Sequence, residues 1–162
     1  EEAKRGHTVA IHSASHKYNQ IYTSEQAFFD DLEQMNSIIK AQTGNDASII
    51  RFPGGSSNTV SKDYCPGIMT QLVNDVTARG LLYCDWNVSS GDANSKPIST
   101  EQVVQNVISG VQSHNVSVVL QHDIKDFSVN AVEQIIQWGQ ANGYTFLPLT
   151  TSSPMSHHRV NN

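Results

Sequence analysis

Two histidines four residues apart are the first residues in this sequence whose types and spacing suggest chemistry. His12 and His16 follow directly after the apolar run of residues 8–11. If the backbone turns helically after that run, both imidazoles fall on one face and can reach one divalent metal ion. Ordinary surface or core histidines are the alternative for this spacing taken alone. A catalytic zinc site would also need a third protein ligand and an open coordination position.

Four further residues carry groups suited to hydrolysis. An arginine such as Arg51 can hold a carboxylate through two parallel hydrogen bonds, and the backbone N–H of Gly54 can approach a substrate oxygen closely. An imidazole such as that of His122 can act as a general acid near neutral pH, and a carboxylate such as Asp92 can orient it. Each also has a simpler reading, namely a surface turn at Arg51 and Gly54, a loop cap at His122 and an Asx turn at Asp92.

The elements that must position these residues follow from the hydrophobic pattern. Strands are predicted at residues 8–11, 48–50, 81–86, 117–120 and 145–147, and helices at 24–41, 66–79, 100–113 and 128–141. A loop at residues 89–95 follows the third predicted strand. Ser24 or Thr23 is available as the N-cap of the first helix, and Gly44 follows as its stop. Alternating strands and helices predict a parallel sheet or barrel, an α/β fold.

In such folds the active site collects beyond the carboxyl ends of the strands. The candidate residues obey this rule, because each comes just after a predicted strand: His12 and His16 after the first, Arg51 after the second, Asp92 after the third and His122 after the fourth. We therefore expect these side chains to lie at one edge of the fold.

Composition excludes several classes of protein. The chain has 162 residues, 38% of them hydrophobic and 15% charged, which is typical of one compact domain and not of a disordered chain. A formal net charge of -5 argues against a nucleic-acid partner. No apolar run is long enough to span a membrane, and no signal-peptide pattern is visible. The two cysteines, Cys65 and Cys84, are expected to be separate thiols, with one disulfide as the alternative.

The first residues of the chain are interpreted as the last turn of a helix that begins further upstream in the same domain. Residues 1–5 are polar and lead through Gly6 directly into the first predicted strand. We therefore expect an N-terminal segment of the same domain to precede this chain. The domain itself is expected to cover residues 1–150, with residues 151–162 as a polar, loose tail.

Four motifs in order resemble those of the polysaccharide deacetylases, the NodB-homology domain of carbohydrate esterase family four. They are His12-Ser13-Ala14-Ser15-His16, Arg51-Phe52-Pro53, Asp92-Ala93 behind Trp86-Asn87-Val88, and Leu120-Gln121-His122. The resemblance extends to about Leu149. It implies a distorted (β/α) barrel, which here would lack its first strand or strands.

The resemblance also implies an activity, the removal of acetyl groups from N-acetylated sugars of an acetylated polysaccharide such as peptidoglycan or a chitin-type polymer. His12 and His16 would hold Zn²⁺, with Co²⁺ or Ni²⁺ as alternatives. An extracytoplasmic location follows from this class of substrate.

The roles of the remaining site residues are implied in the same way. His122, tuned by Asp92, would protonate the departing amine. Gly54 would stabilise the oxyanion through its N–H, Leu120 would line the pocket for the acetyl methyl group, and Arg51 would hold the base aspartate.

The sequence departs from the family pattern in three places. The first motif, Thr-Phe-Asp-Asp-Gly, which supplies the base aspartate and the third metal ligand, is absent. The similar run Phe28-Phe29-Asp30-Asp31 lies on a predicted helix and is interpreted as a solvated helix face. Gly54 stands where an aromatic residue commonly follows the proline, and Ala93 stands where the fourth motif usually has tryptophan.

Two other functions stay open from the sequence. The first is a catalytically inactive glycan-binding or structural relative of the deacetylases. The second is an unrelated α/β hydrolase with Ser56 as nucleophile, against which stands the lack of a Gly-x-Ser-x-Gly elbow.

Overall fold

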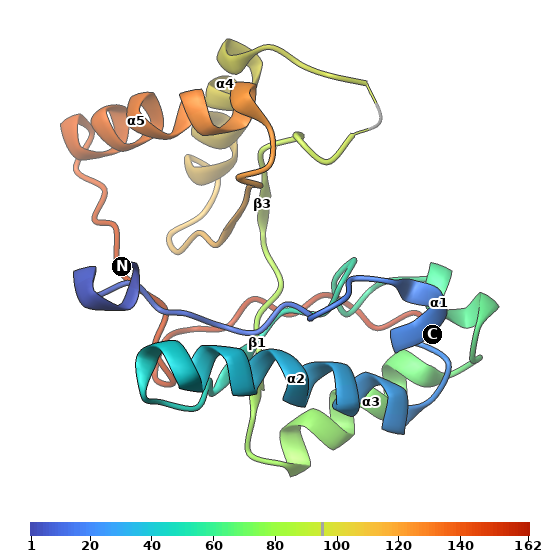
Figure 1. Cartoon of the computed structure of the whole chain (residues 1–162). Coiled ribbons are helices and arrows are strands. Elements are labelled where there is room, and N and C mark those ends of the chain that lie inside the picture. Colours follow the sequence, from blue (N-terminus) through green and yellow to red (C-terminus); the bar gives the residue numbers. More distant parts are fainter. Residues whose placement is uncertain (95) are drawn as a thin grey trace. The chain divides into compact units, whose positions relative to one another are not determined.

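The computed structural model describes residues 1–94 and 96–162 (Figure 1). Ser95, the last residue of the loop expected at 89–95, lies outside the described residues. The chain forms two compact units. The first comprises Glu1–Asp85 and Pro148–Asn162, and the second comprises Trp86–Leu147. The domain boundary expected at residue 150 stays a prediction.

The strands of the first unit run parallel. β1 (Ile49–Ile50) pairs with β2 (Leu82–Tyr83), and α3 (Ile68–Ala78) connects them. Ile11 forms a parallel bridge to Ile50. The predicted strands at 48–50 and 81–86 are therefore confirmed in shortened form, whereas the strand predicted at 8–11 is reduced to this single bridge.

Helix α2 (Glu25–Thr43) forms where the apolar spacing predicts it. The Ser24 side chain caps its N-terminus by accepting a hydrogen bond from Ala27 N at 3.1 Å. Gly44 ends it with a φ of 82°, the left-handed conformation that glycine adopts without strain. The helix buries its apolar face in the core of this unit, with contributions from Phe28, Phe29, Leu32 and Ile39. Shorter helical turns lie at α1 (Tyr18–Ile21), η1 (Ala3–Arg5) and η2 (Val60–Asp63).

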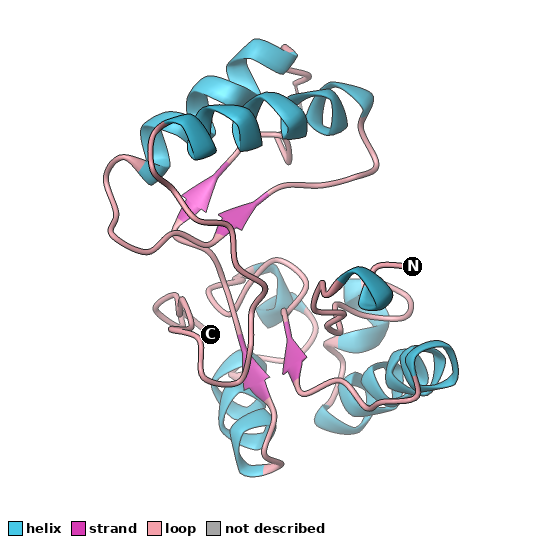
Figure 2. Ribbon diagram, turned by 90° about the vertical axis from the view of Figure 1, so that its left-hand side faces the viewer, coloured by secondary structure: helices cyan, strands magenta, loops and turns pink. Residues whose placement is uncertain are grey.

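The second unit contains one parallel strand pair and two helices. β3 (Val88–Ser89) pairs with β4 (Val119–Leu120), α4 (Thr100–Val111) connects them, and α5 (Asp126–Ala141) follows. The two helices pack side by side, and α4 contacts β3 (Figure 2). Val103, Val104 and Ala131 form the buried centre of this packing.

Two strand assignments differ from the sequence-based expectation. β3 is an additional strand that extends into Ser89, the first residue of the loop expected at 89–95, because its backbone pairs with β4. The strand predicted at 145–147 is wrong: Phe146 and Leu147 are 52% and 79% exposed, and no described residue pairs with this segment. A short apolar run makes a strand only where a neighbouring strand offers hydrogen-bond partners.

The expectation of a loose tail is also wrong. The C-terminal segment is hydrogen-bonded to the earlier part of the first unit, where Asp85 N donates to Ser156 O at 2.7 Å and Thr70 N donates to Asn162 O at 2.7 Å. The His157 ring stacks on Tyr83 with 4.0 Å between centroids. Polar residues therefore fold here through tertiary hydrogen bonds that composition does not reveal.

The strand pairing found among the described residues consists of two separate two-stranded parallel sheets. Closure of these strands into a distorted barrel stays a prediction. Both cysteines are free, so the expectation of separate thiols is confirmed. Within the described part of the chain, no helix is both long and apolar enough to cross a membrane.

Candidate functional site

Three chain segments end side by side in the first unit. Ile11 N donates to Ile49 O at 3.0 Å, and Arg51 N donates to Ile11 O at 2.8 Å. The Arg51 side chain then reaches beyond β2, with Nε donating to Cys84 O at 2.9 Å and Nη2 to Asp85 O at 3.1 Å. His12 and Arg51 therefore lie together at the carboxyl ends of neighbouring parallel segments, as expected for an α/β fold.

The two histidines of the first motif lie close enough to serve one ion. Their ring centroids are 5.0 Å apart, with 59° between the ring planes. His12 Nδ1 lies 2.8 Å from Arg51 O, and a hydrogen bond there requires the proton on Nδ1 and the lone pair on Nε2. Metal-binding histidines in proteins usually make such a second bond to a carbonyl or carboxylate. The pair fits two ligands of a zinc site, although the described residues contain no cluster of three metal-binding side chains.

The backbone between these histidines is a loop, so the helical turn that would place both imidazoles on one face does not form. His16 adopts a φ of 54°, a left-handed conformation that is strained for a residue with a side chain. Its N–H donates to Ser13 Oγ at 2.8 Å. Long-range hydrogen bonds, and not helical periodicity, bring the two rings together.

Asp31 on α2 holds this loop. Its carboxylate accepts hydrogen bonds from Ser13 Oγ at 2.6 Å, from Ala14 N at 2.9 Å and from Ser15 N at 2.9 Å. Partial burial raises the pKa of Asp31, but these hydrogen bonds outweigh it and bring the pKa below its ordinary value. The interpretation of Asp31 as part of a solvated face is therefore wrong. Asp30 does fit that interpretation, because it is exposed.

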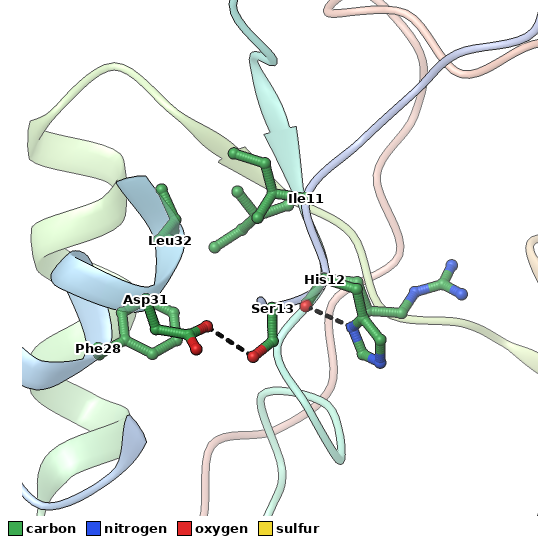
Figure 3. Close-up of a pocket in the computed structure, with 8 residues that line it drawn as sticks. Ile11, His12, Ser13, Phe28, Asp31 and Leu32 are labelled. Carbon is green, nitrogen blue, oxygen red and sulfur yellow. Dashed lines mark hydrogen bonds between the residues drawn. The ribbon is translucent and has the colours of Figure 1, made fainter. Parts of the chain in front are cut away.

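A small pocket with a cavity volume of about 10 Å³, barely enough for one water molecule, lies between the histidine loop and α2. In Figure 3 the Asp31 carboxylate points at Ser13, whereas the His12 imidazole points away from α2. The pocket is lined by Ile11, His12, Ser13, Phe28, Asp31, Leu32, Ile50 and Arg51.

Gly54 occupies a position that only glycine fits. Its φ is 78°, and a Cβ atom there would lie 2.6 Å from Tyr18 Oη. The loop is fixed at the preceding residue, because Tyr22 Oη donates to Pro53 O at 2.7 Å. None of the hydrogen bonds among the described residues uses the Gly54 N–H. This donor is thus able to serve a substrate oxygen, and the Tyr18 ring, which sequence reasoning missed, stands beside it.

Ser56 cannot serve as a nucleophile. Its side chain is fully buried, and its Oγ donates to Asp85 Oδ2 at 2.5 Å, while its N–H donates to Asp85 Oδ1 at 2.8 Å. The same carboxylate accepts the His158 N–H at 2.9 Å. The alternative of a serine hydrolase is therefore wrong for Ser56. Asp85 is a buried structural carboxylate that joins the loop after β1 to the C-terminal segment.

The second unit brings Asp92 and His122 into direct contact. Asp92 Oδ1 lies 2.9 Å from His122 Nδ1, and Oδ2 accepts hydrogen bonds from His122 N at 2.7 Å and Ser128 Oγ at 2.6 Å. Burial raises the pKa of Asp92, but these hydrogen bonds outweigh it and lower the pKa to about 2. The carboxylate is therefore ionised at neutral pH and orients the imidazole through Nδ1, so that Nε2 is the atom that can exchange a proton.

Neighbouring groups fix this pair in place. Ser90 N donates to Leu120 O at 3.0 Å, which aligns the segments that carry Asp92 and His122. The Lys125 ammonium donates to the Asp92 carbonyl. The acyl-pocket role of the half-buried Leu120 stays a prediction, as does the expectation that all candidate side chains share one edge. Ser128 was missed because a serine near the start of a helix carries no distinguishing pattern.

Comparison with known proteins gives a consistent family. The model of the polysaccharide deacetylase family matches residues 1–65. A curated relative, peptidoglycan-N-acetylglucosamine deacetylase from Bacillus cereus, is 29% identical over 149 residues, which are 90% of this chain and 51% of that protein. The chain thus spans about half the length of this curated relative.

Two solved structures show the same fold. One, a carbohydrate esterase family four pseudoenzyme from Bacillus anthracis, shares 20% identity with a TM-score of 0.66, covering 88% of this chain and 44% of that chain. The other is the catalytic domain of peptidoglycan N-acetylglucosamine deacetylase from Eubacterium rectale ATCC 33656, with a TM-score of 0.98 and 99% identity, covering 99% of this chain and 73% of that chain. Since near-identity over most of a deacetylase domain accompanies the match to the family model, this chain belongs to the polysaccharide deacetylase family.

Proposed function

We propose that this chain forms the greater part of a metal-dependent hydrolase that removes acetyl groups from the N-acetylated sugars of a polysaccharide, with peptidoglycan as the first candidate. The observation that carries the proposal is the histidine pair, whose rings lie 5.0 Å apart while His12 Nδ1 faces the Arg51 carbonyl. The names of the Eubacterium rectale and Bacillus cereus relatives support peptidoglycan N-acetylglucosamine as substrate.

In this proposal His12 and His16 hold the divalent ion, Zn²⁺ or else Co²⁺ or Ni²⁺. We assign the third ligand and the base to aspartates of a preceding segment of the same domain, in line with the longer Eubacterium rectale catalytic domain, of which this chain covers 73%. The ion, when bound, polarises the acetamide carbonyl and lowers the pKa of a water molecule. Arg51, whose guanidinium is anchored on the Cys84 and Asp85 carbonyls, holds the base aspartate.

The other residues act on the two ends of the amide bond that breaks. The Gly54 N–H donates to the carbonyl oxygen as negative charge develops there. Leu120 contacts the acetyl methyl group. His122 donates a proton from Nε2 to the departing nitrogen, because an amine leaves readily only once it is protonated. The ionised Asp92 stabilises the positive imidazole through Nδ1.

The test measures acetate release from N-acetylglucosamine oligomers and peptidoglycan by the full-length protein. A chelator should abolish the release and added Zn²⁺ or Co²⁺ should restore it. His12→Ala and His16→Ala should remove both metal binding and activity. The control is His114→Ala, because His114 is exposed and its Nδ1 faces Gly110 O at the end of α4. Activity that survives chelation and both substitutions would refute the proposal.

The 162-residue chain provides a second arm of this test. Two histidines make an incomplete site, so the chain alone should bind metal weakly and deacetylate poorly, and a chain extended upstream should recover both properties. Full activity of the 162-residue chain would contradict the assignment of the third ligand and the base to an upstream segment.

The second candidate function is that of a catalytically inactive glycan-binding or structural relative. It is favoured by the structural similarity to the Bacillus anthracis pseudoenzyme. This function predicts binding of acetylated glycan without acetate release and without an effect of chelator. An extracytoplasmic location is part of both proposals, because the polysaccharide that the protein would deacetylate or bind lies outside the cytoplasm. Cell fractionation with an antibody against the protein tests that location.

A further inference from the structure

We propose that Asp31 is a positioning residue, which holds the loop between His12 and His16 in the shape that lets both imidazoles bind one metal ion. This inference rests on the proposed metal site. It assigns a functional role to a residue of α2 that lies outside the four sequence motifs.

Both oxygens of the Asp31 carboxylate are engaged with the loop. Oδ2 accepts from Ser13 Oγ at 2.6 Å and from Ala14 N at 2.9 Å, and Oδ1 accepts from Ser15 N at 2.9 Å. Three consecutive residues between the histidines are therefore bound to one side chain. An ionised carboxylate is the group that can accept all three bonds, and such charge-assisted bonds are stronger than neutral ones.

The Ser13 hydroxyl transmits this constraint to the second histidine. It donates to Asp31 and accepts from His16 N at 2.8 Å. His16 has a φ of 54°, a conformation that residues with a side chain adopt only when the surrounding structure imposes it. Loss of Asp31 would let the loop relax, and the His16 ring would leave its position 5.0 Å from the His12 ring.

Helix α2 gives the carboxylate a rigid base. The helix has 19 residues, and its Phe28 and Leu32, on either side of Asp31 in sequence, are buried in the core of the first unit. His12 is fixed independently, through its bond to the Arg51 carbonyl at 2.8 Å. A metal site needs its ligands held closely in place by supporting groups, and Asp31 provides that support for the loop that ends at His16.

The neighbouring Asp30 offers a matched control. It lies on the same helix and carries the same charge, but its carboxylate accepts a hydrogen bond from the exposed Gln26 side chain at 2.7 Å and none from the histidine loop. Asp31→Asn and Asp30→Asn therefore remove the same charge from adjacent positions, and only the first disturbs the loop. In Asp31→Asn an NH₂ group replaces one carboxylate oxygen, so a donor faces the donors of the histidine loop and cannot accept their hydrogen bonds.

The experiment measures the dissociation constant for Zn²⁺ and Co²⁺ in the full-length protein by competition with a chromophoric chelator, together with the Tm of the metal-free protein. Asp31→Asn should weaken metal binding roughly 10–100-fold, the usual effect of losing a group that orients a metal ligand. Asp30→Asn should bind metal like the wild type. Ser13→Ala, which removes only the hydroxyl between Asp31 and His16, should weaken binding by a smaller factor.

The outcomes separate the inference from the function on which it rests. Wild-type protein that binds no metal overturns both. Wild-type protein that binds metal, with unchanged affinity in Asp31→Asn, overturns the role of Asp31 alone. If Asp31→Asn does not fold, Ser13→Ala decides, and unchanged affinity in that folded variant overturns the inference. Equal weakening in Asp30→Asn also overturns it, because a general charge effect would then explain the result.

Discussion

His122 Nδ1 lies 2.9 Å from Asp92 Oδ1, a residue 30 positions earlier in the chain, and the same carboxylate accepts the His122 backbone N–H at 2.7 Å. One side chain therefore fixes both the backbone and the ring of the histidine. The pairing follows from β3 and β4, whose parallel register aligns Ser89 with Leu120 and so brings the residues just beyond both strands together. This geometry supports an acid–base role for His122, with Asp92 as its orienting partner.

If Asp92 and His122 act as one unit, the losses of kcat caused by their separate substitutions should not multiply in the double variant. His122→Ala should lower kcat for deacetylation by about 10²–10⁴-fold, the usual contribution of a general acid. Asp92→Asn should also lower kcat, and the double variant should be no worse than the more impaired single variant. Acetate release by the full-length protein measures this. Asp123→Asn, at an exposed neighbouring position, is the control, and multiplicative losses would show that the two residues act independently.

Stability in acid should depend on Asp92. Its pKa is about 2 in the folded chain against an ordinary value of 3.8, so the ionised carboxylate stabilises the fold above pH 3.8. This contribution is lost as the pH falls from about 4 through 2. Since one pKa unit corresponds to about 1.4 kcal/mol, its size is on the order of 2 kcal/mol. Urea unfolding from pH 2 to 6 should show a flatter pH dependence in Asp92→Asn, and an unchanged slope would contradict this source of acid sensitivity.

Gly54 and Gly67 allow a steric clash to be separated from backbone strain. Their φ values are 78° and 82°, but a Cβ at Gly54 would lie 2.6 Å from Tyr18 Oη, whereas a Cβ at Gly67 would meet nothing within 4 Å. Gly67→Ala should therefore cost only the left-handed strain, about 1–2 kcal/mol. Gly54→Ala should reduce the free energy of unfolding by more than this.

Tyr18→Phe in the Gly54→Ala background removes the clashing oxygen. The free energy of unfolding should then fall only by the amount that the left-handed backbone strain costs. Urea denaturation of the four proteins measures these differences. If Gly54→Ala and Gly67→Ala lower the free energy of unfolding equally, Tyr18 moves aside at little cost, and its close approach to Gly54 does not affect stability.

Local signals predicted the helices well. Ser24 before α2 and Gly44 after it bracket a run whose apolar residues recur every three to four positions, and the helix forms between them with these caps. These signals succeed because capping and helical periodicity are properties of neighbouring residues. The run at 145–147 shows the limit of local reasoning, since its β-type composition finds no partner strand among the described residues.

Residues of the candidate site fell into two groups. His12, Arg51, Asp92 and His122 were proposed from the sequence, because each follows a predicted strand and carries a group suited to hydrolysis, and their roles stay predictions. Asp31 was misread because its side chain looks like any acidic residue on a helix, and its partners are 16 to 18 positions away. The buried Asp85 was missed because its partners, Ser56 and His158, lie 29 and 73 positions away in the sequence.

The sequence by itself determined the helices, the order of the strand-end residues and their resemblance to one family of deacetylases. These depend on residue type and spacing along the chain, which the printed sequence contains in full. Only the tertiary structure decided that a carboxylate on α2 shapes the histidine loop, that Asp92 binds two of the three His122 nitrogens, Nδ1 and the backbone N, and that the polar tail is hydrogen-bonded within the first unit. Each of these is a hydrogen bond between distant residues, and its energy depends on where the folded backbone places the two partners.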